Sequence, residues 1–358
     1  MEQQIHPPVG PLPDWDPEVQ GLVEAWPDQL PGDEGLAALR GSRRDRLPPS
    51  DLARDGVFRV SHQSIASRSQ ASLDLTILVP ARAAACGAIY WLHSGGQVGG
   101  SSVSPDLVPV LEIAERHALV VVAAEYALAP EHPAPAGLHD AYDGLLWTAG
   151  HAVELAYPRE ALFLHGLSGG GGLAAGAALM ARDAGIAMAG LVLDGPMLDD
   201  RLHSVSMRQH QQSGLPMIDS LRLMWRAVIG PDDSVHRRAP HAAPGRLSGE
   251  DLSGLPPAYI VCGANDPFRD EVTAFAQGIW RSGGSADLHQ WAGIGHGFDL
   301  LASDAHVCEE LIAGRRAWYD RMLHRVHDPR VNTRPTRIIR RRRQLIPRPE
   351  PSGKACSR

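Results

Sequence analysis

The sequence predicts an α/β protein whose mostly parallel central sheet carries helices on both faces. Two observations lead to this prediction. From Val57 onward, short apolar or alternating segments typical of strands take turns with longer segments of helical periodicity, and this alternation is typical of βαβ units. Hydrophobic residues make up 44% of the 358 residues and charged residues 21%, which is ordinary for a globular protein.

The first half of the alternation begins with two β-rich segments, Val57–Ile65 and Leu73–Val79. Gly87–Leu92 (GAIYWL) is a short apolar run that ends in a glycine-rich turn, which predicts a buried strand. A helical pattern covers Leu107–His117. Ala118–Ala124 (ALVVVAA) follows, and a run this short and apolar indicates a strand that is buried on both faces.

The remaining elements keep the same alternation. In chain order they are a helix at His139–Gly150, a strand at Ala161–His165, a helix at Leu173–Ala184, strands at Gly190–Asp194 and Ala258–Cys262, a helix at Glu271–Ser282, a strand at Ala286–Trp291 and a helix near Val307–His324. Ligands of such sheets bind outside the carboxyl ends of the strands. The residues that follow each strand are therefore the candidates for a functional site.

Two segments stand outside this alternation. Residues 1 to about 50 are broken by prolines and contain two short helical patterns, near Pro17–Trp26 and Glu34–Arg44. Leu202–Gly230 interrupts the order with a long polar helical insertion. Residues 1 to about 50 cannot form a core of their own, so they are expected to lie on the α/β domain. This domain is assigned to residues 51–328 and includes the insertion.

The composition excludes several classes of protein. No apolar run approaches the ~20 residues that a membrane-spanning helix needs, and the first 30 residues, rich in Pro and Asp, lack the pattern of a signal peptide. The four cysteines lie too far apart for a zinc or redox motif. We therefore expect a cytoplasmic protein with free thiols and no membrane span.

Charge is distributed unevenly along the chain. The net charge is −7, yet residues 330–358 carry ten basic residues and one acid. We expect residues 329–358 to form a basic, solvated and disordered tail. Contact of Arg340–Arg343 with nucleic acid or anionic lipid is the alternative. For the rest of the chain, the acidic balance argues against a nucleic-acid partner.

The most informative motif follows the Ala161–His165 strand. Gly166-Leu167-Ser168-Gly169-Gly170 is a G-x-S-x-G pattern between a predicted strand and a predicted helix. The sharp turn at this place needs small residues on both sides of the serine, and it presents the serine Oγ at the edge of the sheet. The hydroxyl of Ser168 is therefore a candidate nucleophile.

Two other strand ends carry candidate catalytic groups. Asp266 lies at the tip of the loop after Ala258–Cys262, and His296, flanked by glycines, lies in the loop after the last strand. The order Ser168, Asp266, His296 is that of an α/β-hydrolase triad. Asp194, at the end of its own strand, is the rival for the acid.

Two further histidines are assigned structural roles. His93-Ser94-Gly95-Gly96 follows the Gly87–Leu92 strand, where glycines let backbone N–H groups approach an oxyanion. We expect His93 to fix this loop rather than to take part in catalysis. His165, on the buried strand before the serine, is expected to be a core histidine with satisfied hydrogen bonds.

These motifs together resemble the hormone-sensitive lipase-like family of α/β-hydrolase esterases. His93–Gly96 is similar to the family's H-G-G-G, Gly166–Gly170 to its G-D-S-A-G, Asp266–Glu271 (DPFRDE) to its D-P-L-R-D-E and His296–Phe298 to its H-G-F. The segment between Tyr126 and Tyr142 resembles the one that follows the family's fourth strand. The resemblance covers about Asp16 to Arg325.

The resemblance implies an esterase with a serine nucleophile. Ser168 would attack the ester, His296 would act as general base and acid, and Asp266 would orient the imidazole. The implied oxyanion hole consists of the N–H groups of Gly95, Gly96 and Gly169.

The resemblance also implies a helical cap, here residues 1–50 together with about 202–230. The implied substrate is a small-molecule ester, and the implied mechanism requires no metal or organic cofactor. A homodimer is compatible with the resemblance. Two alternatives to hydrolysis stay open. One is a non-catalytic ligand-binding member of the fold, against which the presence of His296 argues. The other is transfer of the acyl group to an alcohol by the same triad.

Three positions depart from the family pattern. Ser94 replaces the first glycine of H-G-G-G, Leu167 replaces the Asp or Thr before the nucleophile, and Gly169 replaces Ala, which creates a run of four glycines, Gly169–Gly172. Glycine in a helix interior costs about 1 kcal/mol relative to alanine. We therefore expect the turn around Ser168 to be less firmly held than usual.

Overall fold

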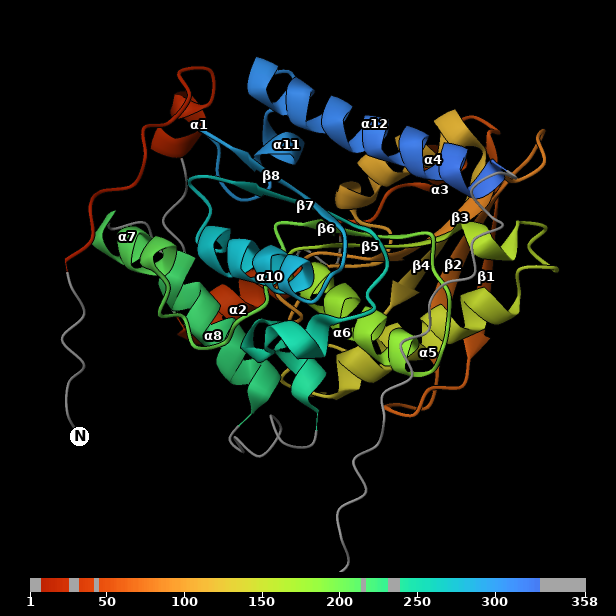
Figure 1. Ribbon diagram of the computed structural model, residues 1–358, viewed down its shortest axis with the longest axis horizontal. Coiled ribbons are helices and arrows are strands. Elements are labelled where there is room, and N and C mark those ends of the chain that lie inside the picture. Colours follow the sequence, from red (N-terminus) through yellow and green to blue (C-terminus); the bar gives the residue numbers. More distant parts are fainter. Residues whose placement is uncertain (1–7, 26–31, 42–44, 214–216, 231–238, 329–358) are drawn as a thin grey trace, which may run out of the picture.

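The computed structural model describes residues 8–25, 32–41, 45–213, 217–230 and 239–328. One eight-stranded sheet runs through this part of the chain (Figure 1). Its strands are β1 (Phe58–Ile65), β2 (Leu73–Pro80), β3 (Gly87–Leu92), β4 (Leu119–Glu125), β5 (Leu162–Leu167), β6 (Gly190–Asp194), β7 (Ala258–Gly263) and β8 (Ala286–Trp291). All eight predicted strands are confirmed, with ends that differ by two residues at most.

The strand order in the sheet is β1-β2-β4-β3-β5-β6-β7-β8. The pairs β1–β2 and β2–β4 are antiparallel, and every pair from β4 through β3 to β8 is parallel. The sheet is therefore mostly parallel, as predicted, with an antiparallel edge. The carboxyl ends of β3, β5, β6, β7 and β8 lie along one edge of the sheet.

Helices cover both faces of the sheet (Figure 1). One face carries α5 (Ala136–Gly150), α6 (Gly169–Asp183) and α10 (Arg269–Arg281), and the other carries α3 (Pro49–Ala53), α4 (Val108–His117), α11 (Phe298–Leu301) and α12 (His306–His327). All five predicted helices of the alternation are confirmed. Helix α6 begins four residues earlier than predicted, because the glycines that follow Ser168 are themselves helical.

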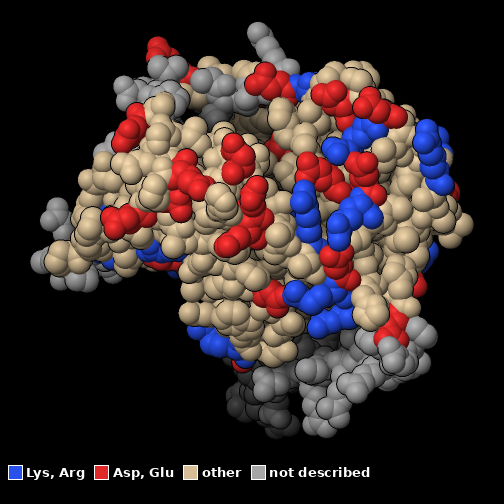
Figure 2. Space-filling model, turned by 90° about the horizontal axis from the view of Figure 1, so that it is seen from above, with Lys and Arg blue, Asp and Glu red and all other residues tan. Residues whose placement is uncertain are grey.

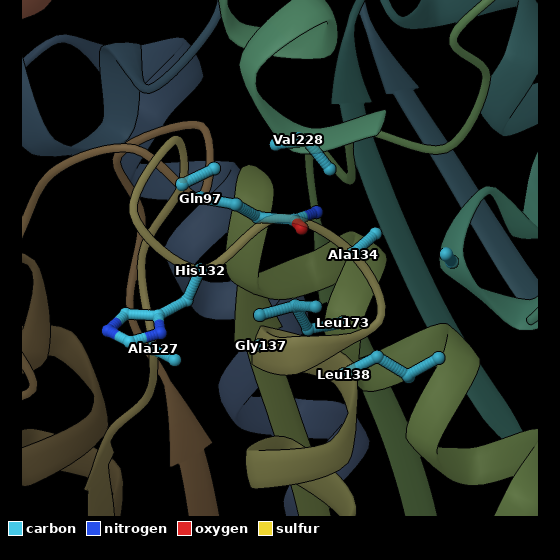
Figure 3. A pocket seen from close by; sticks show the side chains of 10 residues that line it. Gln97, Ala127, His132, Ala134, Gly137, Leu138, Leu173 and Val228 are labelled. Atoms are coloured by element: carbon cyan, nitrogen blue, oxygen red, sulfur yellow. The ribbon is translucent and has the colours of Figure 1, made fainter. Parts of the chain in front are cut away.

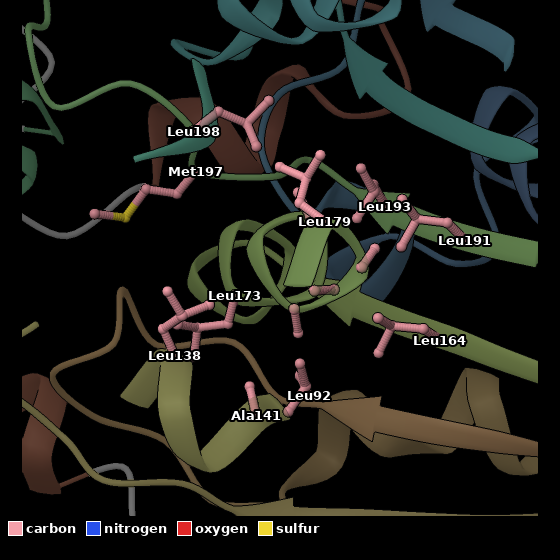
Figure 4. Packing of buried hydrophobic residues seen from close by; sticks show 14 of the residues in the cluster. Leu92, Leu138, Ala141, Leu164, Leu173, Leu179, Leu191, Leu193, Met197 and Leu198 are labelled. Atoms are coloured by element: carbon pink, nitrogen blue, oxygen red, sulfur yellow. The ribbon is translucent and has the colours of Figure 1, made fainter. Parts of the chain in front are cut away.

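Successive side chains of a strand point alternately into two hydrophobic cores, one on each face of the sheet. In β3, Tyr90 and Leu92 join the cluster under α5 and α6, whereas Ile89 and Trp91 join the cluster under α4 and α12. This alternation follows from the period of two in a strand and explains why the central strands are apolar throughout. Figure 4 shows leucines of β3, β5 and β6 packed against leucines of α5 and α6.

The two segments outside the alternation form further helices. They are α1 (Gln20–Glu24), α2 (Gly32–Gly41), α7 (Val205–Ser213) and α8 (Met217–Ile229). Helix α8 contacts both α2 and α7, and α7 contacts α10. The start of the chain and the insertion after β6 are thus brought together, although about 160 residues separate them in the sequence.

Ion pairs fasten α12 to its neighbours. Arg316 Nη2 lies 2.6 Å from Glu112 Oε2 of α4, and Arg321 pairs with Asp287 of β8. Figure 2 shows acidic and basic side chains interspersed over the face of the molecule that carries α12.

Within the described ranges, no helix is both long enough and apolar enough to cross a bilayer. The basic tail, residues 329–358, lies outside the described residues.

Candidate active site

Ser168 is the single residue between strand β5 and helix α6. Its backbone has φ 57° and ψ −119°, a left-handed conformation that non-glycine residues rarely adopt. A Cβ added to Gly166 would lie 2.3 Å from the carbonyl oxygen of Gly170, and one added to Gly170 would lie 2.2 Å from that of His93. The two glycines of the motif are therefore required by backbone contacts on either side of the serine.

The structure brings Ser168, His296 and Asp266 into one hydrogen-bonded chain. His296 Nε2 lies 2.9 Å from Ser168 Oγ, and His296 Nδ1 lies 2.8 Å from Asp266 Oδ2. The other carboxylate oxygen of Asp266 accepts the N–H of Phe268 at 2.8 Å. Asp266 is 1% exposed and Ser168 8%. Three residues from the carboxyl ends of three strands thus meet in the order that the sequence predicts.

The carboxylate of Asp266 determines the charge preference of His296. Burial favours the neutral ring, but the Asp266 carboxylate and its hydrogen bond favour the imidazolium, and Asp299 adds to this effect. The pKa of His296 therefore lies above its ordinary value of 6.5. An imidazole of this kind can take up a proton from a neighbouring hydroxyl and hold it during a reaction.

Asp194, the rival candidate for the acid, faces a different histidine. Its Oδ2 lies 2.9 Å from His165 Nε2, and the Nδ1 atom of His165 lies 3.2 Å from the hydroxyl of Tyr319. Both ring nitrogens of His165 thus have partners, and burial lowers its pKa. His165 is the buried core histidine that the sequence predicts.

A glycine-rich loop after β3 lies against the turn that carries Ser168. Gly95 and Gly96 have φ of 107° and 61°, positive values that favour glycine. A Cβ on Gly169 would lie 2.6 Å from the backbone nitrogen of Gln97 and 2.8 Å from that of Gly96. The N–H groups of Gly95 and Gly96 donate to no backbone acceptor within the described ranges.

His93 holds this loop in place. Its Nδ1 lies 2.7 Å from the carbonyl oxygen of Ser94, and its ring stacks on Tyr126 at 4.1 Å between centroids. The hydroxyl of Tyr126 donates to the carbonyl oxygen of His93 at 2.8 Å. The backbone N–H of Ser94 donates to Asp106 at 2.9 Å. These contacts agree with the structural role predicted for His93.

The four glycines after Ser168 are explained by close packing. Gly169 faces the loop after β3 and Gly170 faces the end of β3, whereas Gly171 faces Pro196. A Cβ on Gly172 would lie 2.1 Å from the carbonyl oxygen of Met197. The run lets α6 begin in contact with backbone on two sides, and the expectation that the turn is less firmly held stays a prediction.

Gln97 is a polar residue beside the site that motif spacing does not mark. It is 6% exposed, and its Nε2 lies 3.3 Å from the carbonyl oxygen of Gly169. Figure 3 shows its carboxamide directed into a small cavity between Leu173 of α6 and Val228 of α8. Gln97 thereby joins the loop after β3 to the start of α6.

Met224 of helix α8 lies directly over the loop after β3. A Cβ on Gly96 would lie only 2.3 Å from the sulfur of Met224. This contact places the insertion after β6 above the site. The sequence predicted that the insertion packs on the domain, but it gave no means of selecting one side chain of α8.

The N-terminal segment packs on the loop that carries His296. Trp15 stacks on Phe298 with ring centroids 5.5 Å apart, and it lies against Gly295. The N–H of Asp16 donates to the carbonyl oxygen of Gly293 at 2.9 Å. Residues on both sides of His296 are therefore held by the start of the chain.

The acidic residues after Asp266 bind neighbouring loops. Arg269 Nε lies 2.8 Å from Asp270 Oδ1. Glu271 Oε1 accepts the N–H groups of Leu198 and Asp199 at 2.7 and 3.2 Å. The described part of the chain contains no cluster of His, Cys, Asp and Glu side chains suited to a metal ion.

Comparisons with known proteins agree with this geometry. Residues 89–300, more than half of the chain, match the model of a family described as alpha/beta hydrolase fold. Carboxylesterase NlhH of Mycobacterium tuberculosis is 28% identical over 326 residues, which cover 87% of this chain and 97% of that protein. Esterase LipI of the same species is 30% identical and covers 79% and 87%.

A solved structure extends the likeness to three dimensions. A bacterial heroin esterase superposes with a TM-score of 0.75 at 31% identity, covering 86% of this chain and 98% of its own. The fold and the site define an α/β hydrolase. The chain belongs to the alpha/beta hydrolase fold family, in its hormone-sensitive lipase-like branch, and these relatives place it among the carboxylic ester hydrolases.

Proposed function

We propose that the protein hydrolyses carboxylic esters with Ser168 as nucleophile, His296 as general base and acid, and Asp266 as the group that orients the imidazole. The observation that carries this proposal is the unbroken chain of hydrogen bonds from Ser168 Oγ through both nitrogens of His296 to Asp266 Oδ2, at 2.9 and 2.8 Å. A hydroxyl, an imidazole and a buried carboxylate in this order form an activated nucleophile.

The first half of the reaction forms an acyl-enzyme. His296 Nε2 takes the proton of Ser168 as Oγ attacks the ester carbonyl, and the resulting imidazolium is stabilised by Asp266. The tetrahedral intermediate collapses when His296 gives this proton to the leaving alcohol. Water then repeats the sequence on the acyl-enzyme, which releases the carboxylic acid and restores the serine hydroxyl.

Backbone N–H groups stabilise the negative charge of the tetrahedral intermediate. We assign this role to Gly95, Gly96 and Gly169. Support comes from the contact between Gly169 and the loop after β3, and from the position of Gly169 at the N-terminus of α6, where the helix dipole favours an anion. In other enzymes the loss of one such donor lowers kcat by roughly 10²–10³-fold.

A cap made of residues 1–50 and about 202–230 would select the substrate. Met224 of α8 supports this assignment, because its sulfur lies against Gly96, one of the proposed oxyanion donors. An apolar side chain at this place favours a compact ester with an apolar acyl or alcohol group. Relatives named as a carboxylesterase and a heroin esterase support an ester as the substrate.

The test is hydrolysis of p-nitrophenyl esters with two to twelve acyl carbons by the full chain and by Ser168→Ala. We expect turnover of the short esters by the unchanged protein and background rates with Ser168→Ala, whose circular dichroism should match. Ser101→Ala is the matched control, because Ser101 is also buried and its hydroxyl donates to Glu125 instead of contacting a triad residue. Undiminished turnover by the folded Ser168→Ala protein would refute the proposal.

A further inference from the structure

A single buried arginine joins two segments of the proposed active site. Arg315 of α12 is 2% exposed, and its Nε lies 3.2 Å from Asp194 Oδ2, at the end of β6. Its Nη2 pairs with the carboxylate of Asp299 in α11. The two carboxylates belong to segments that are 105 residues apart, and the guanidinium bridges them.

The Asp194 side of this bridge supports the nucleophile. The carbonyl oxygen of Asp194 accepts the N–H of Ser168 at 2.9 Å. The next residue, Gly195, lies against the general base, because a Cβ there would be 3.0 Å from His296 Nδ1. The end of β6 therefore contacts both the serine and the histidine, and Arg315 together with His165 holds the Asp194 side chain.

The Asp299 side of the bridge supports the general base. Asp299 follows His296 by three residues, in the short helix α11 that begins immediately after Gly297. Its carboxylate is 9% exposed and favours the protonated form of His296. The cation of Arg315 pairs with this carboxylate and compensates its charge.

A buried network of this kind does not follow from packing alone. Charged groups lose hydration on burial, and well-packed apolar residues often stabilise a fold equally well. Among the described residues neither Asp194 Oδ1 nor Arg315 Nε has a hydrogen-bond partner, so the contact of Arg315 with Asp194 is an ion pair at 3.2 Å without a hydrogen bond, and the network carries an uncompensated cost at these two atoms. Its position between the two catalytic segments gives a functional reason for it.

We propose that Arg315 is a positioning residue of the ester hydrolase: its guanidinium fixes the segment of His296 relative to the turn of Ser168 and balances the charge of Asp299 near the imidazole. This inference rests on the proposed function. Arg315 touches neither the substrate nor the reacting atoms, and it acts through Asp194 and Asp299.

The effect of Arg315 on the protonation of His296 depends on the other groups around the imidazole. Asp266 is hydrogen-bonded to the ring from the loop after β7, and the carboxylate of Asp299 in α11 acts on the ring electrostatically. His210 of α7 interacts electrostatically with both His296 and Asp266, and burial lowers its pKa, which favours its neutral form. Ser168 contributes only its hydroxyl. Removal of Arg315 therefore leaves carboxylates as the charged groups on the ring and favours the imidazolium.

The experiment compares pH profiles of kcat/KM for p-nitrophenyl acetate. The acid limb of this profile reports protonation of the free enzyme's base. We expect Arg315→Met to move the limb to higher pH and Asp299→Asn to move it to lower pH, each by about half a unit, which is about threefold in kcat/KM on the limb. The double variant should return the limb toward its original place.

A matched control comes from the same helix. Arg316 is the next residue and forms a surface pair with Glu112 at 2.6 Å, so Arg316→Met should leave the limb unchanged. Arg315→Lys keeps the charge but not the two-sided geometry, so it should lower kcat with little movement of the limb. If Arg315→Met does not fold, Asp299→Asn and Arg315→Lys decide, because both are close in shape to the original residues.

The outcomes separate this inference from the proposed function. Turnover that survives Ser168→Ala would refute the function itself. Turnover that depends on Ser168, with the limbs of folded Arg315→Met and Asp299→Asn coinciding with that of the unchanged protein, would refute only the inference. Shifts of the two limbs in the same direction would also refute it, because opposite charges are removed.

Discussion

Replacing Gly169 by alanine, the residue that the family pattern G-D-S-A-G has at this position, tests whether in this chain the turn of Ser168 and the loop after β3 lie too close together to admit a Cβ. A Cβ at this position would lie 2.6 Å from the nitrogen of Gln97 and 2.8 Å from the nitrogen and Cα of Gly96. Ordinary van der Waals contact begins at 3.4 Å, so the loop would have to retreat by about 0.8 Å. The obstructing atoms are backbone and cannot rotate away.

A displacement of this size should affect the transition state far more than the fold. In enzymes, misplacing a catalytic group by about 1 Å can cost roughly 10²-fold in rate. We therefore expect kcat to fall about 10²-fold, or ~2.7 kcal/mol of transition-state stabilisation. The free energy of unfolding should fall by about 2 kcal/mol at most, because alanine favours the helix by about 1 kcal/mol whereas overpacking costs roughly 1–3 kcal/mol.

The assay measures kcat and KM with p-nitrophenyl acetate, beside urea unfolding of each variant. The matched control is Gly150→Ala, since Gly150 ends α5 and a Cβ there would meet no atom within 4 Å. Gly150→Ala should keep its kcat. A folded Gly169→Ala protein with unchanged kcat would show that the loop tolerates displacement, and the assignment of Gly96 and Gly169 as rigid oxyanion donors would be wrong.

Three further results are expected. For p-nitrophenyl acetate, kcat/KM should rise with pH through an apparent pKa above 6.5, since Asp266 raises the pKa of His296 and only the neutral ring accepts the serine proton; a midpoint below 6.5 would contradict this. Asp266→Asn should lower kcat by up to about 10⁴-fold while circular dichroism stays unchanged, whereas a loss below tenfold would point to another acid. Trp15→Ala removes the stacking on Phe298. The thermal midpoint, measured by scanning calorimetry, and kcat, measured in the ester assay, should therefore both fall. Unchanged kcat would show that the N-terminal segment does not hold the loop of His296.

The strands could be predicted because burial requires apolar residues, and runs of such residues are visible in the sequence. Runs such as Gly87–Leu92 are apolar throughout, since both faces of the sheet are covered. Errors arose at the ends, where backbone conformation decides. The sequence predicts that the fourth strand begins at Ala118, but Ala118 has φ 51° and closes α4, so β4 begins at Leu119.

The candidate triad could also be predicted, because its motifs record contacts of the backbone. Gly166 and Gly170 are small for a reason that any turn of this type imposes. The DPFRDE context already favours Asp266 over Asp194 in the sequence, and the structure adds the partner of each carboxylate. Both follow a strand at the same edge of the sheet, and only the structure separates the partner of His296 from the partner of His165.

The charge network around Arg315 left no such mark on the sequence. The chain has 33 arginines, and one that lies in an amphipathic helix would ordinarily be assigned to the exposed face. Its partners lie 121 and 16 residues before it, in segments that the sheet and α11 bring together. A backbone motif such as the turn of Ser168 depends on residues that are adjacent in the chain. A buried charge depends on partners that only the fold brings next to it. For this reason the reacting groups are visible in the sequence, and the residue that we propose to align them is not.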